Sequence, residues 1–358
     1  MGFLRFPNPG SDVKRFAAVL RTIYKNIGES KVFTHDDGVD ALIHSGHASS
    51  SGAIGKEAIK RSTRDDRSRD PLYNQHKMYS ELYRMLGWYE PAAMNTKFKL
   101  TDLSYYINLS ENDPDFERGL VEEGLLGICF PNFLVNNKGG NQLRYFYFLL
   151  FMMEQLGGLM YRDEIILSVH TLMDDRPLEN AIESQVQLVN EIRGNVDNIN
   201  EAMKGLMTLS GIDINTLKNY TRFPIGALQF SGWAEPVYDR ELYGQSLKCY
   251  QITDYGRERI KVLRSLKDIR YNDINKYDYE EQVAFTLLSN YVFLKRAGLN
   301  IEHDEEINFV LTRAKEHCGT ILKAFSIIDT NTILYSPIQQ GPQELYKDAS
   351  KLYDKLKA

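Results

Sequence analysis

A short segment that occurs twice in the sequence limits the folds that are open to this chain. Residues 82–91 and 227–236 both end in Gly-Trp-x-Glu-Pro, and the two copies use both tryptophans of the protein, Trp88 and Trp233. Each Gly-Trp pair follows an apolar segment. The pattern therefore indicates a helix that ends at glycine, a residue that tolerates the left-handed conformation. The Trp is expected to pack as the chain leaves the helix, and the Pro to start a turn.

A second shared phrase follows each copy after a loop. Residues 98–104 and 250–256 begin with alternating apolar and polar side chains and continue with Thr-Asp. The alternation is typical of a strand, and Thr or Asp can cap the helix that follows. Helix, turn, strand and helix, in this order, form the second half of a winged helix. The sequence therefore predicts a mainly α protein with short β wings, an α+β fold of tandem winged-helix domains. The alternative is a packing corner of the kind that Gly-Trp marks in other α-rich proteins.

The repeat and the changes of composition along the chain predict four parts. We expect a first winged-helix unit over residues 1–110 and a second over residues 111–266. The second is interrupted by a polar helical insertion at about 177–206. Residues 267–340 are expected to form a third, degenerate winged-helix unit, and residues 341–358 a C-terminal helix or linker. Apolar periodicity predicts helices near residues 11–27, 71–87, 143–157, 162–171, 214–231, 279–296 and 304–318, with loops and one short helix between 108 and 142.

Composition favours a globular protein of a reducing compartment. The 358 residues are enough for two or three modest domains, and 43% of them are hydrophobic. The three cysteines lie far apart and form no CxxC pair, so neither a zinc ribbon nor a disulfide framework is expected. The apolar stretch at 145–153 is too short to span a bilayer, and no N-terminal signal is visible. We expect a cytoplasmic protein without a membrane partner.

The net charge of −5 does not favour nucleic acid, but the basic residues are concentrated at particular places. The stretch 56–69 leads into the helix that ends at the first Gly-Trp, and a second polar approach precedes the other copy. Lys and Arg neutralise phosphates, while Asn, Gln and Arg on a helix can contact base edges. The candidate DNA-binding residues are Lys60, Arg61, Arg64, Arg67, Arg69, Asn74, Gln75, Lys77, Lys138, Lys218, Asn219 and Arg222. The alternative for the basic stretch is a solvated loop, because Asp65 and Asp66 lie within it.

The sequence contains none of the common catalytic motifs that we searched for. It has no phosphate-binding GxxxxGK[ST] loop, no GxSxG nucleophile motif and no HExxH metal motif. A magnesium-dependent nuclease needs an acidic residue followed by a strand with Asp/Glu-x-Lys. Pro114-Asp115 begins such a pattern, but no suitable strand follows it. The catalytic residues are therefore unknown, and no metal site or cofactor is predicted within this chain.

The repeated units resemble the DNA-recognition region of type IIS restriction endonucleases of the FokI and AlwI kind. The resemblance depends on residues 86–88 with 98–102, on residues 250–256 leading into 260–263, and on the apolar helix at 145–157 followed by 161–165. It implies tandem winged helices that bind double-stranded DNA. In that family a PD-(D/E)xK nuclease domain follows the recognition part, whereas this chain ends at Ala358, so no catalytic residue is transferred.

These observations lead to one expected function and two alternatives. We expect sequence-specific binding of double-stranded DNA as the recognition part of a restriction endonuclease system, with a nuclease subunit or domain outside this chain that would use Mg²⁺. One alternative is a complete Mg²⁺-dependent endonuclease with an active site that the sequence does not reveal. The other is a winged-helix scaffold for protein interactions. The recognition sequence, the oligomeric state and the unit that contacts each base are not predicted.

Overall fold

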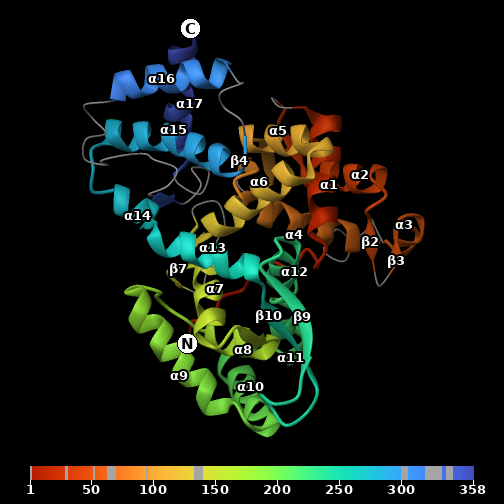
Figure 1. Ribbon diagram of the computed structural model, residues 1–358. Helices are drawn as coiled ribbons and strands as arrows, with labels where there is room; N and C mark the ends of the chain where they lie inside the picture. The colour runs from red at the N-terminus through yellow and green to blue at the C-terminus, as the bar shows by residue number, and fades with distance from the viewer. Residues whose placement is uncertain are drawn as a thin grey trace. The chain divides into compact units, whose positions relative to one another are not determined.

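A computed structural model describes residues 2–28, 31–50, 53–62, 70–93, 96–132, 140–299, 305–318, 333–335 and 342–358. Helices dominate, and the strands form small sheets (Figure 1). This confirms a mainly α chain of the α+β class. The chain divides into two compact units, which are described separately below. Unit 1 comprises residues 1–16, 129–131 and 136–264, and unit 2 comprises residues 17–128, 132–135 and 265–358.

Unit 2 contains the first copy of the repeated segment. Its helices are α1 (Val13–Ile27, whose first residues to Phe16 belong to unit 1), α2 (His35–His44), α3 (Lys56–Arg61), α4 (Pro71–Met85), α5 (Asp102–Leu109), the 3-10 helix η1 (Ser110–Asn112), α6 (Pro114–Gly127), α14 (Tyr271–Ile274), α15 (Tyr279–Arg296), α16 (Glu305–Cys318) and α17 (Gln343–Lys357). Its strands are β1 (Phe33–Thr34), β2 (Ser49–Ser50), β3 (Ala53–Ile54), β4 (Tyr89–Ala93), β5 (Lys97–Leu100), β11 (Lys267–Ile269) and β12 (Ile333–Tyr335). The antiparallel sheet that follows α4 has the strand order β1-β5-β4, with Phe33 opposite Phe98.

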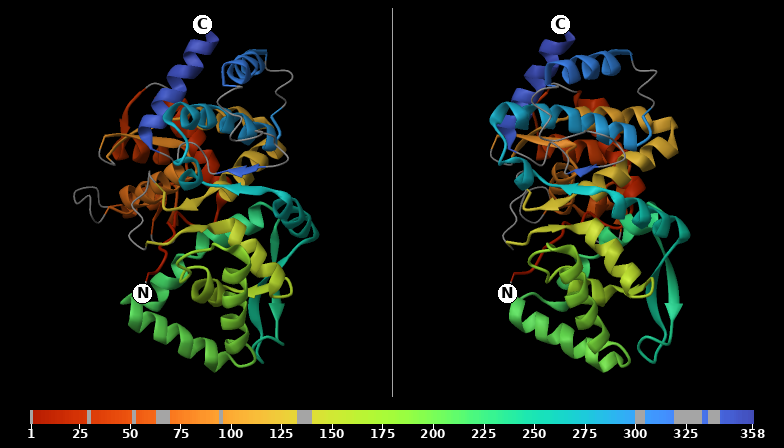
Figure 2. Two further views of the ribbon diagram at one scale, coloured as in Figure 1. Left: turned by 90° about the vertical axis from the view of Figure 1, so that its left-hand side faces the viewer. Right: turned by 60° about the vertical axis from the view of Figure 1, so that its left-hand side comes forward.

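Unit 1 contains the second copy. Its helices are α7 (Tyr145–Gln155), α8 (Arg162–Ser168), α9 (Leu178–Ile192), α10 (Val196–Ser210), α11 (Ile214–Asn219), α12 (Arg222–Phe230) and α13 (Asp254–Ser265, whose last residue belongs to unit 2). Its strands are β6 (Cys129–Phe130), β7 (Leu143–Arg144), β8 (Leu159–Tyr161), β9 (Ala234–Asp239) and β10 (Leu247–Ile252). The sheet has the order β8-β10-β9, so the first strand again pairs with the third. The β9–β10 pair extends as a long hairpin (Figure 2).

Local sequence explains where several helices begin. The Asp70 carboxylate accepts hydrogen bonds from Leu72 N and Tyr73 N at 2.9 and 3.3 Å, which satisfies two free N–H groups at the start of α4. Pro71 occupies the first turn of α4, where its missing N–H costs nothing. A reciprocal pair of bonds between Asp278 and Glu281 caps α15. The helix starts predicted at Pro71 and near residue 279 are confirmed.

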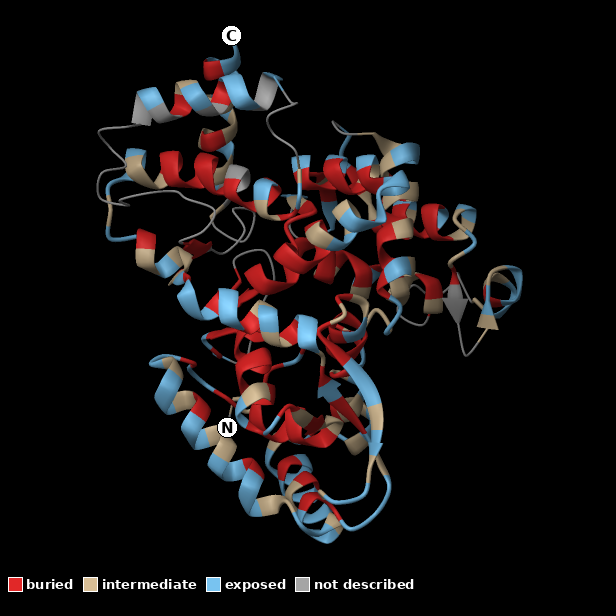
Figure 3. Cartoon of the chain, viewed as in Figure 1, coloured by how far each residue is buried: buried red, intermediate tan, exposed pale blue. Residues whose placement is uncertain are grey.

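The core of unit 1 is built around α7. Its residues from Tyr145 to Met153 are all buried, as expected for a helix that is apolar on every side (Figure 3). The N-terminal segment lies against this core: the Phe6 ring is 4.7 Å from that of Tyr145 and 6.1 Å from that of Phe223 on α12. His170 fixes the segment, because its ring nitrogens lie 2.8 Å from Leu4 O and 2.8 Å from the Tyr145 hydroxyl.

Several predicted elements differ from those observed. Between residues 108 and 142 the sequence suggested loops and one short helix, but α6 has 14 residues and buries Leu120, Leu125 and Leu126. Residues 214–231, expected to carry a helix with residues 218–222 as its approach, form two helices, α11 and α12, because the chain turns at Tyr220-Thr221. The polar insertion forms α9 and α10, which extend to Ser210. The four-part domain division stays a prediction.

The structure adds two findings on the C-terminal part and on membranes. Strands β11 and β12 pair in parallel, and residues 300–304, 319–332 and 336–340 of the predicted third unit lie outside the described residues. Within the part of the chain that the structure describes, no helix has the length and apolar character needed to cross a membrane.

Candidate nucleic-acid interface

The two copies of the repeated segment form the same hydrogen-bonded corner. Gly87 and Gly232 both have positive φ, at 74° and 69°, where a side chain would be strained. The N–H of the following tryptophan donates back to a carbonyl in the last turn of the helix, from Trp88 to Tyr83 at 2.7 Å and from Trp233 to Leu228 at 2.9 Å. Both indole rings are fully buried. The predicted helix end at Gly-Trp is confirmed in both copies.

The Thr-Asp phrase closes the same corner in both units. Thr101 Oγ1 donates to Gly87 O at 2.6 Å, and Thr253 Oγ1 donates to Gly232 O at 2.5 Å. The N–H of each threonine also donates to the tryptophan carbonyl, at 3.2 and 3.0 Å. Only Thr253 also caps its helix through its side chain, by accepting from Gly256 N at 3.0 Å, whereas Thr101 makes no such cap bond. The duplication in sequence is therefore a duplication of a specific bonded geometry.

The close approach behind this corner explains one difference between the copies. At the third position after the threonine, unit 2 has Ser104, whose hydroxyl donates to Trp88 O. Unit 1 has Gly256, and a Cβ at that position would lie 2.3 Å from Trp233 O. The second corner therefore requires glycine, because a methyl group there would overlap with backbone.

In unit 2 the predicted DNA-binding residues lie on α3 and α4. Lys60 and Arg61 are exposed at the end of α3, and Arg61 Nε is 3.2 Å from a Glu57 carboxylate oxygen. Lys77 is exposed on α4, whereas Asn74 and Gln75 are half-buried. The Gln75 amide donates to His47 O at 3.4 Å and to the Tyr79 hydroxyl at 3.3 Å. Arg64, Arg67, Arg69 and Lys138 lie outside the described residues, so the structure does not place them.

Helical spacing predicts that Asn74, Lys77, Glu81 and Arg84 share the polar face of α4, and this prediction is wrong for Arg84. Arg84, expected opposite the apolar face, is only 8% exposed; its Nε donates to Ser80 O and its guanidinium lies 5.7 Å from the centre of the Phe98 ring. Burial lowers the pKa of Arg84, although nearby Glu81 opposes the shift. The sheet β1-β5-β4 supplies Phe98, which covers this side of the helix. The long arginine stem can pack on such a surface, so helical periodicity alone does not show which face is solvated.

In its first half, α4 packs closely on α2. A Cβ at Gly38 of α2 would lie 1.9 Å from His76 Nε2, so the imidazole ring occupies the space that this glycine leaves. The facing Nδ1 atoms of His35 and His76 are 3.0 Å apart. Burial, together with the nearby His35, lowers the pKa of His76 to about 3, so the ring is neutral near pH 7. This packing leaves Lys77 as the exposed residue of α4, a helix that the structure describes completely.

In unit 1 the predicted residues lie at the α11–α12 junction. Asn219 and Arg222 are exposed there, while the rest of the first two turns of α12, from Phe223 to Leu228, is buried. Lys218 is 33% exposed, and its Nζ lies 3.6 Å from a carboxylate oxygen of Asp163, a buried residue on α8. Asp163 also accepts from Arg162 Nε at 2.9 Å. On α12 the exposed polar side chains therefore lie at its two ends, Arg222 at the start and Gln229 near the end.

The β9–β10 hairpin carries exposed groups that the sequence pattern did not single out. Tyr238 is 78% exposed and lies opposite Lys248, which is also exposed. Lys248 Nζ lies 6.0 Å from the centre of the Tyr250 ring. In unit 2, Lys97 is exposed at the start of β5. The alternation of side chains along the predicted strands was the available signal, because it places one face of each hairpin in solvent.

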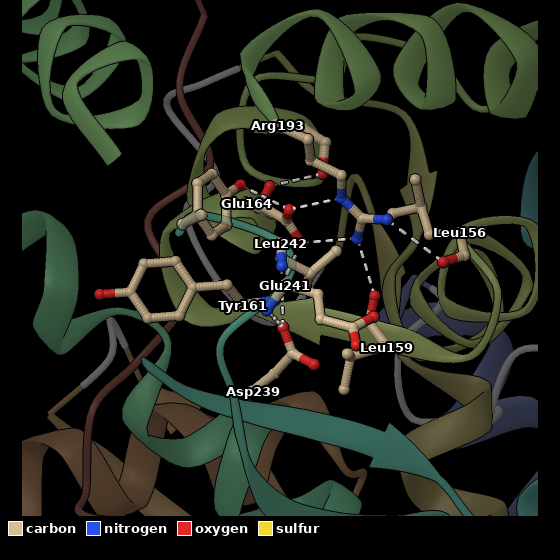
Figure 4. A network of polar contacts seen from close by, with 10 residues as sticks. Leu156, Leu159, Tyr161, Glu164, Arg193, Asp239, Glu241 and Leu242 are labelled. Atoms are coloured by element: carbon tan, nitrogen blue, oxygen red, sulfur yellow. Dashed lines mark hydrogen bonds and ion pairs between the residues drawn. The ribbon is translucent and has the colours of Figure 1, made fainter. Parts of the chain in front are cut away.

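A buried polar network holds the helical insertion on unit 1 (Figure 4). Glu164 of α8 is fully buried, and Arg193, which follows α9, donates to both of its carboxylate oxygens at 2.8 and 3.1 Å. Tyr243 OH and Tyr161 N donate to the same carboxylate at 2.6 and 2.8 Å. Burial opposes the charge of Arg193, but the bonds to Glu164 outweigh it and raise the pKa of the guanidinium. The network stabilises the position of α9 and carries no exposed reactive group.

The described residues of both units form polar surfaces. Within the described residues no group of three or more His, Cys, Asp or Glu side chains is placed to hold a metal ion. The chemistry that these surfaces offer is the pairing of cations with phosphate and the contact of amide and guanidinium groups with base edges.

Comparison with known proteins does not assign this chain to a family. No family model matches the sequence, and no curated protein matches it. Among solved structures, restriction endonuclease FokI is similar over 99% of this chain and 67% of the FokI chain, with 13% sequence identity and a TM-score of 0.38. At that TM-score the likeness carries no argument about fold or function.

Proposed function

We propose that this protein binds double-stranded DNA in a sequence-specific manner through two winged-helix units, as the recognition part of a restriction endonuclease system. The duplicated architecture carries the proposal. Each unit has a helix that ends at Gly-Trp, an antiparallel hairpin, and a three-stranded sheet in which the first strand pairs with the third. Helix-turn-helix proteins place their second helix in the major groove, with its N-terminal residues at the base edges.

The exposed groups are placed for separate contacts to phosphates. They do not form a continuous helix face that could contact several base edges. Lys60, Arg61 and Lys77 in unit 2 are solvated cations. In unit 1, Asn219 and Arg222 stand at the start of α12, where an amide and a guanidinium can reach base edges in the major groove. We therefore assign direct base contacts to the α11–α12 junction and phosphate contacts to α3 and Lys77. The hairpin residues Tyr238 and Lys248 extend the proposed surface of unit 1.

Cleavage is assigned to a nuclease subunit or domain outside this chain, which would use Mg²⁺. The residues of this chain would bind the DNA and fix the position of the protein on its recognition sequence. This assignment is tested together with binding, since a nuclease site within the chain would reveal itself as Mg²⁺-dependent cleavage near the bound sequence.

The first experiment is a selection from random duplex DNA at low salt, with and without Mg²⁺, read on a gel. An enriched motif that is bound but not cut is the expected result. Cleavage near the motif would instead identify a complete endonuclease. The absence of any enriched motif would overturn the proposal and favour a scaffold for protein interactions.

Matched variants then test the assigned residues by fluorescence anisotropy on the enriched duplex. Replacing Lys60, Arg61 and Lys77 by Gln is expected to lower the slope of log K against log salt by roughly 0.9 for each phosphate that is no longer neutralised. Asn219→Ala is expected to cost about 1–3 kcal/mol and to relax selectivity at one base pair. The control, Lys351→Gln on α17, removes an exposed cation that pairs with Asp348 and should leave both quantities unchanged. An unchanged salt slope in the triple variant would contradict the assignment.

A further inference from the structure

Unit 1 has a groove of about 1080 Å³ between α7 and α9, which takes no part in the proposed DNA surface. One wall is formed by side chains of α7 at four-residue spacing, Tyr147, Phe151 and Gln155. The aromatic rings of Tyr147 and Phe151 are 4.8 Å apart and make this wall continuous. Residues four apart lie on one face of a helix, so the row runs along the length of the groove.

The opposite wall, on α9, consists of two parallel rows of side chains. The inner row is apolar: Leu178, Ile182 and Val186. The row beside it is Glu179, Glu183, Gln187 and Glu191, again at four-residue spacing. Glu179, Glu183 and Glu191 are exposed, and they are all the charged residues of α9. The groove thus has an apolar interior and an acidic rim.

The structure already contains one cation in this groove. The Arg264 guanidinium lies 5.5 Å from the centre of the Phe151 ring, and its Nη2 is 2.5 Å from a Glu154 carboxylate oxygen. Aromatic faces and carboxylates together are favourable surroundings for guanidinium groups. Arg264 shows how the groove accepts a basic side chain, and the rim carboxylates offer the same pairing along the rest of its length.

We propose that the α7–α9 groove binds a basic amphipathic helix of a partner protein. A helix of three to four turns is about 20 Å long, which matches α9, and its apolar residues at four-residue spacing would pack over the line where the α7 row meets the apolar row of α9. Lys or Arg residues beside that apolar row would face Glu179, Glu183 and Glu191. DNA does not fit this site, because the phosphates would meet an acidic rim. The proposal is independent of the DNA-binding function.

The test uses a fluorescein-labelled helical peptide of Leu and Arg, with the Leu residues four apart, and measures anisotropy with the full chain. We expect saturable binding in the micromolar range that weakens with salt. A matched peptide with Glu in place of every Arg should bind at least about tenfold more weakly. A scrambled peptide of the basic composition, which has no continuous apolar face, should also bind more weakly.

Two triple variants of equal charge locate the binding site. E179Q/E183Q/E191Q removes the charge of the rim and is expected to lower the affinity for the basic peptide about tenfold or more. E201Q/E235Q/E241Q removes three exposed carboxylates of unit 1 outside the groove and should leave its affinity unchanged. Equal losses in both variants, equal binding of the acidic peptide, or no binding of the basic peptide would each overturn the proposal. Self-association that is weakened by the rim variant, without peptide binding, would identify a second copy as the occupant and would also overturn it.

Discussion

The substitution Glu164→Gln tests whether the insertion is held on unit 1 by a buried ion pair. The change keeps the size of the side chain and removes its charge. It leaves Arg193, whose side chain is only 15% exposed, without its carboxylate, and it turns an amide NH₂ toward groups that donate hydrogen bonds. Tyr243 OH would lose a charged acceptor in the same step.

The expected magnitude follows from the contacts of Arg193. Breaking a buried pair by removing one partner costs about 3–5 kcal/mol, because the other charge remains buried. Arg193 also donates to Leu159 O at 2.8 Å and to Leu156 O at 3.3 Å, and these carbonyls still stabilise the guanidinium in the variant. We therefore expect the low end, about 3 kcal/mol. For a unit of this size this corresponds to a fall of roughly 6–12 °C in the melting temperature.

The two tryptophans make the assay specific to a unit, because Trp233 belongs to unit 1 and Trp88 to unit 2. Incorporation of 5-fluorotryptophan gives one ¹⁹F signal for each unit, and urea titration followed by both signals separates their unfolding. Glu164→Gln should lower the urea midpoint of the Trp233 signal and leave the urea midpoint of the Trp88 signal unchanged. A loss of less than about 1 kcal/mol at Trp233 would refute the reasoning from the buried pair.

Two controls separate the charge from the change of residue. Glu258→Gln breaks an exposed pair with Lys261, whose two side chains are 67% and 66% exposed, and should cost no more than about 0.5 kcal/mol. Adding Arg193→Met to Glu164→Gln removes both charges, and it should recover part of the lost stability because no uncompensated charge remains.

Three further outcomes are expected. Gly256→Ala should destabilise unit 1 by roughly 1–3 kcal/mol because the added Cβ would overlap with Trp233 O. Gly205→Ala on α10, where the Cβ would meet open space, should instead stabilise by about 0.5–1 kcal/mol. Equal effects of the two substitutions in urea titration would contradict the close contact at Gly256. Burial lowers the pKa of His170 to about 4, although its bond to Leu4 opposes this, so the unfolded chain takes up a proton below about pH 6.5 while the folded chain does not. The free energy of unfolding of unit 1 should fall by about 2 kcal/mol from pH 7 to pH 5, and this loss should be absent in His170→Phe. A urea midpoint of the Trp233 signal that does not change with pH would contradict this prediction. Asp163→Asn should free Lys218 from its carboxylate and strengthen DNA binding at low salt, measured as a lower Kd for the selected duplex; a weaker affinity would contradict a phosphate role for Lys218.

The fold was predictable where local chemistry decides it. Gly-Trp marked the helix ends because only glycine takes the positive φ of 74° and 69° without strain. Pro71 marked the start of α4 because a residue in the first helical turn needs no N–H for the helix, and Asp70, which the sequence pattern did not single out, accepts bonds from the free N–H groups there. The parallel pairing of β11 with β12 was not predictable, since two three-residue segments far apart in sequence carry no pattern that specifies their partner.

The candidate site was predictable only in part, because exposure depends on contacts that sequence does not reveal. Lys77, Asn219 and Arg222 are exposed as expected, but Arg84 is covered by Phe98 and Gln75 bonds to its own surroundings. A polar residue can stand at a solvated position of a helix, or its stem can pack on an aromatic ring. Both kinds of residue occur at the same helical spacing, so the spacing does not distinguish them. Only the neighbouring sheet distinguishes them.

The duplication therefore constrains the scaffold more tightly than it constrains the ligand. Both corners use the same bond from threonine to glycine, yet the exposed cations come from α3 and Lys77 in unit 2 and from the α11–α12 junction in unit 1. If both units contacted DNA in the same way, equivalent positions would carry the basic groups. Because they do not, we expect the two units to contribute unequally. Variants at Asn219 and Arg222 should then change sequence preference, while variants at Lys60, Arg61 and Lys77 should change affinity without changing the selected motif. A motif altered equally by both sets would show that the units are functionally equivalent despite their different surfaces.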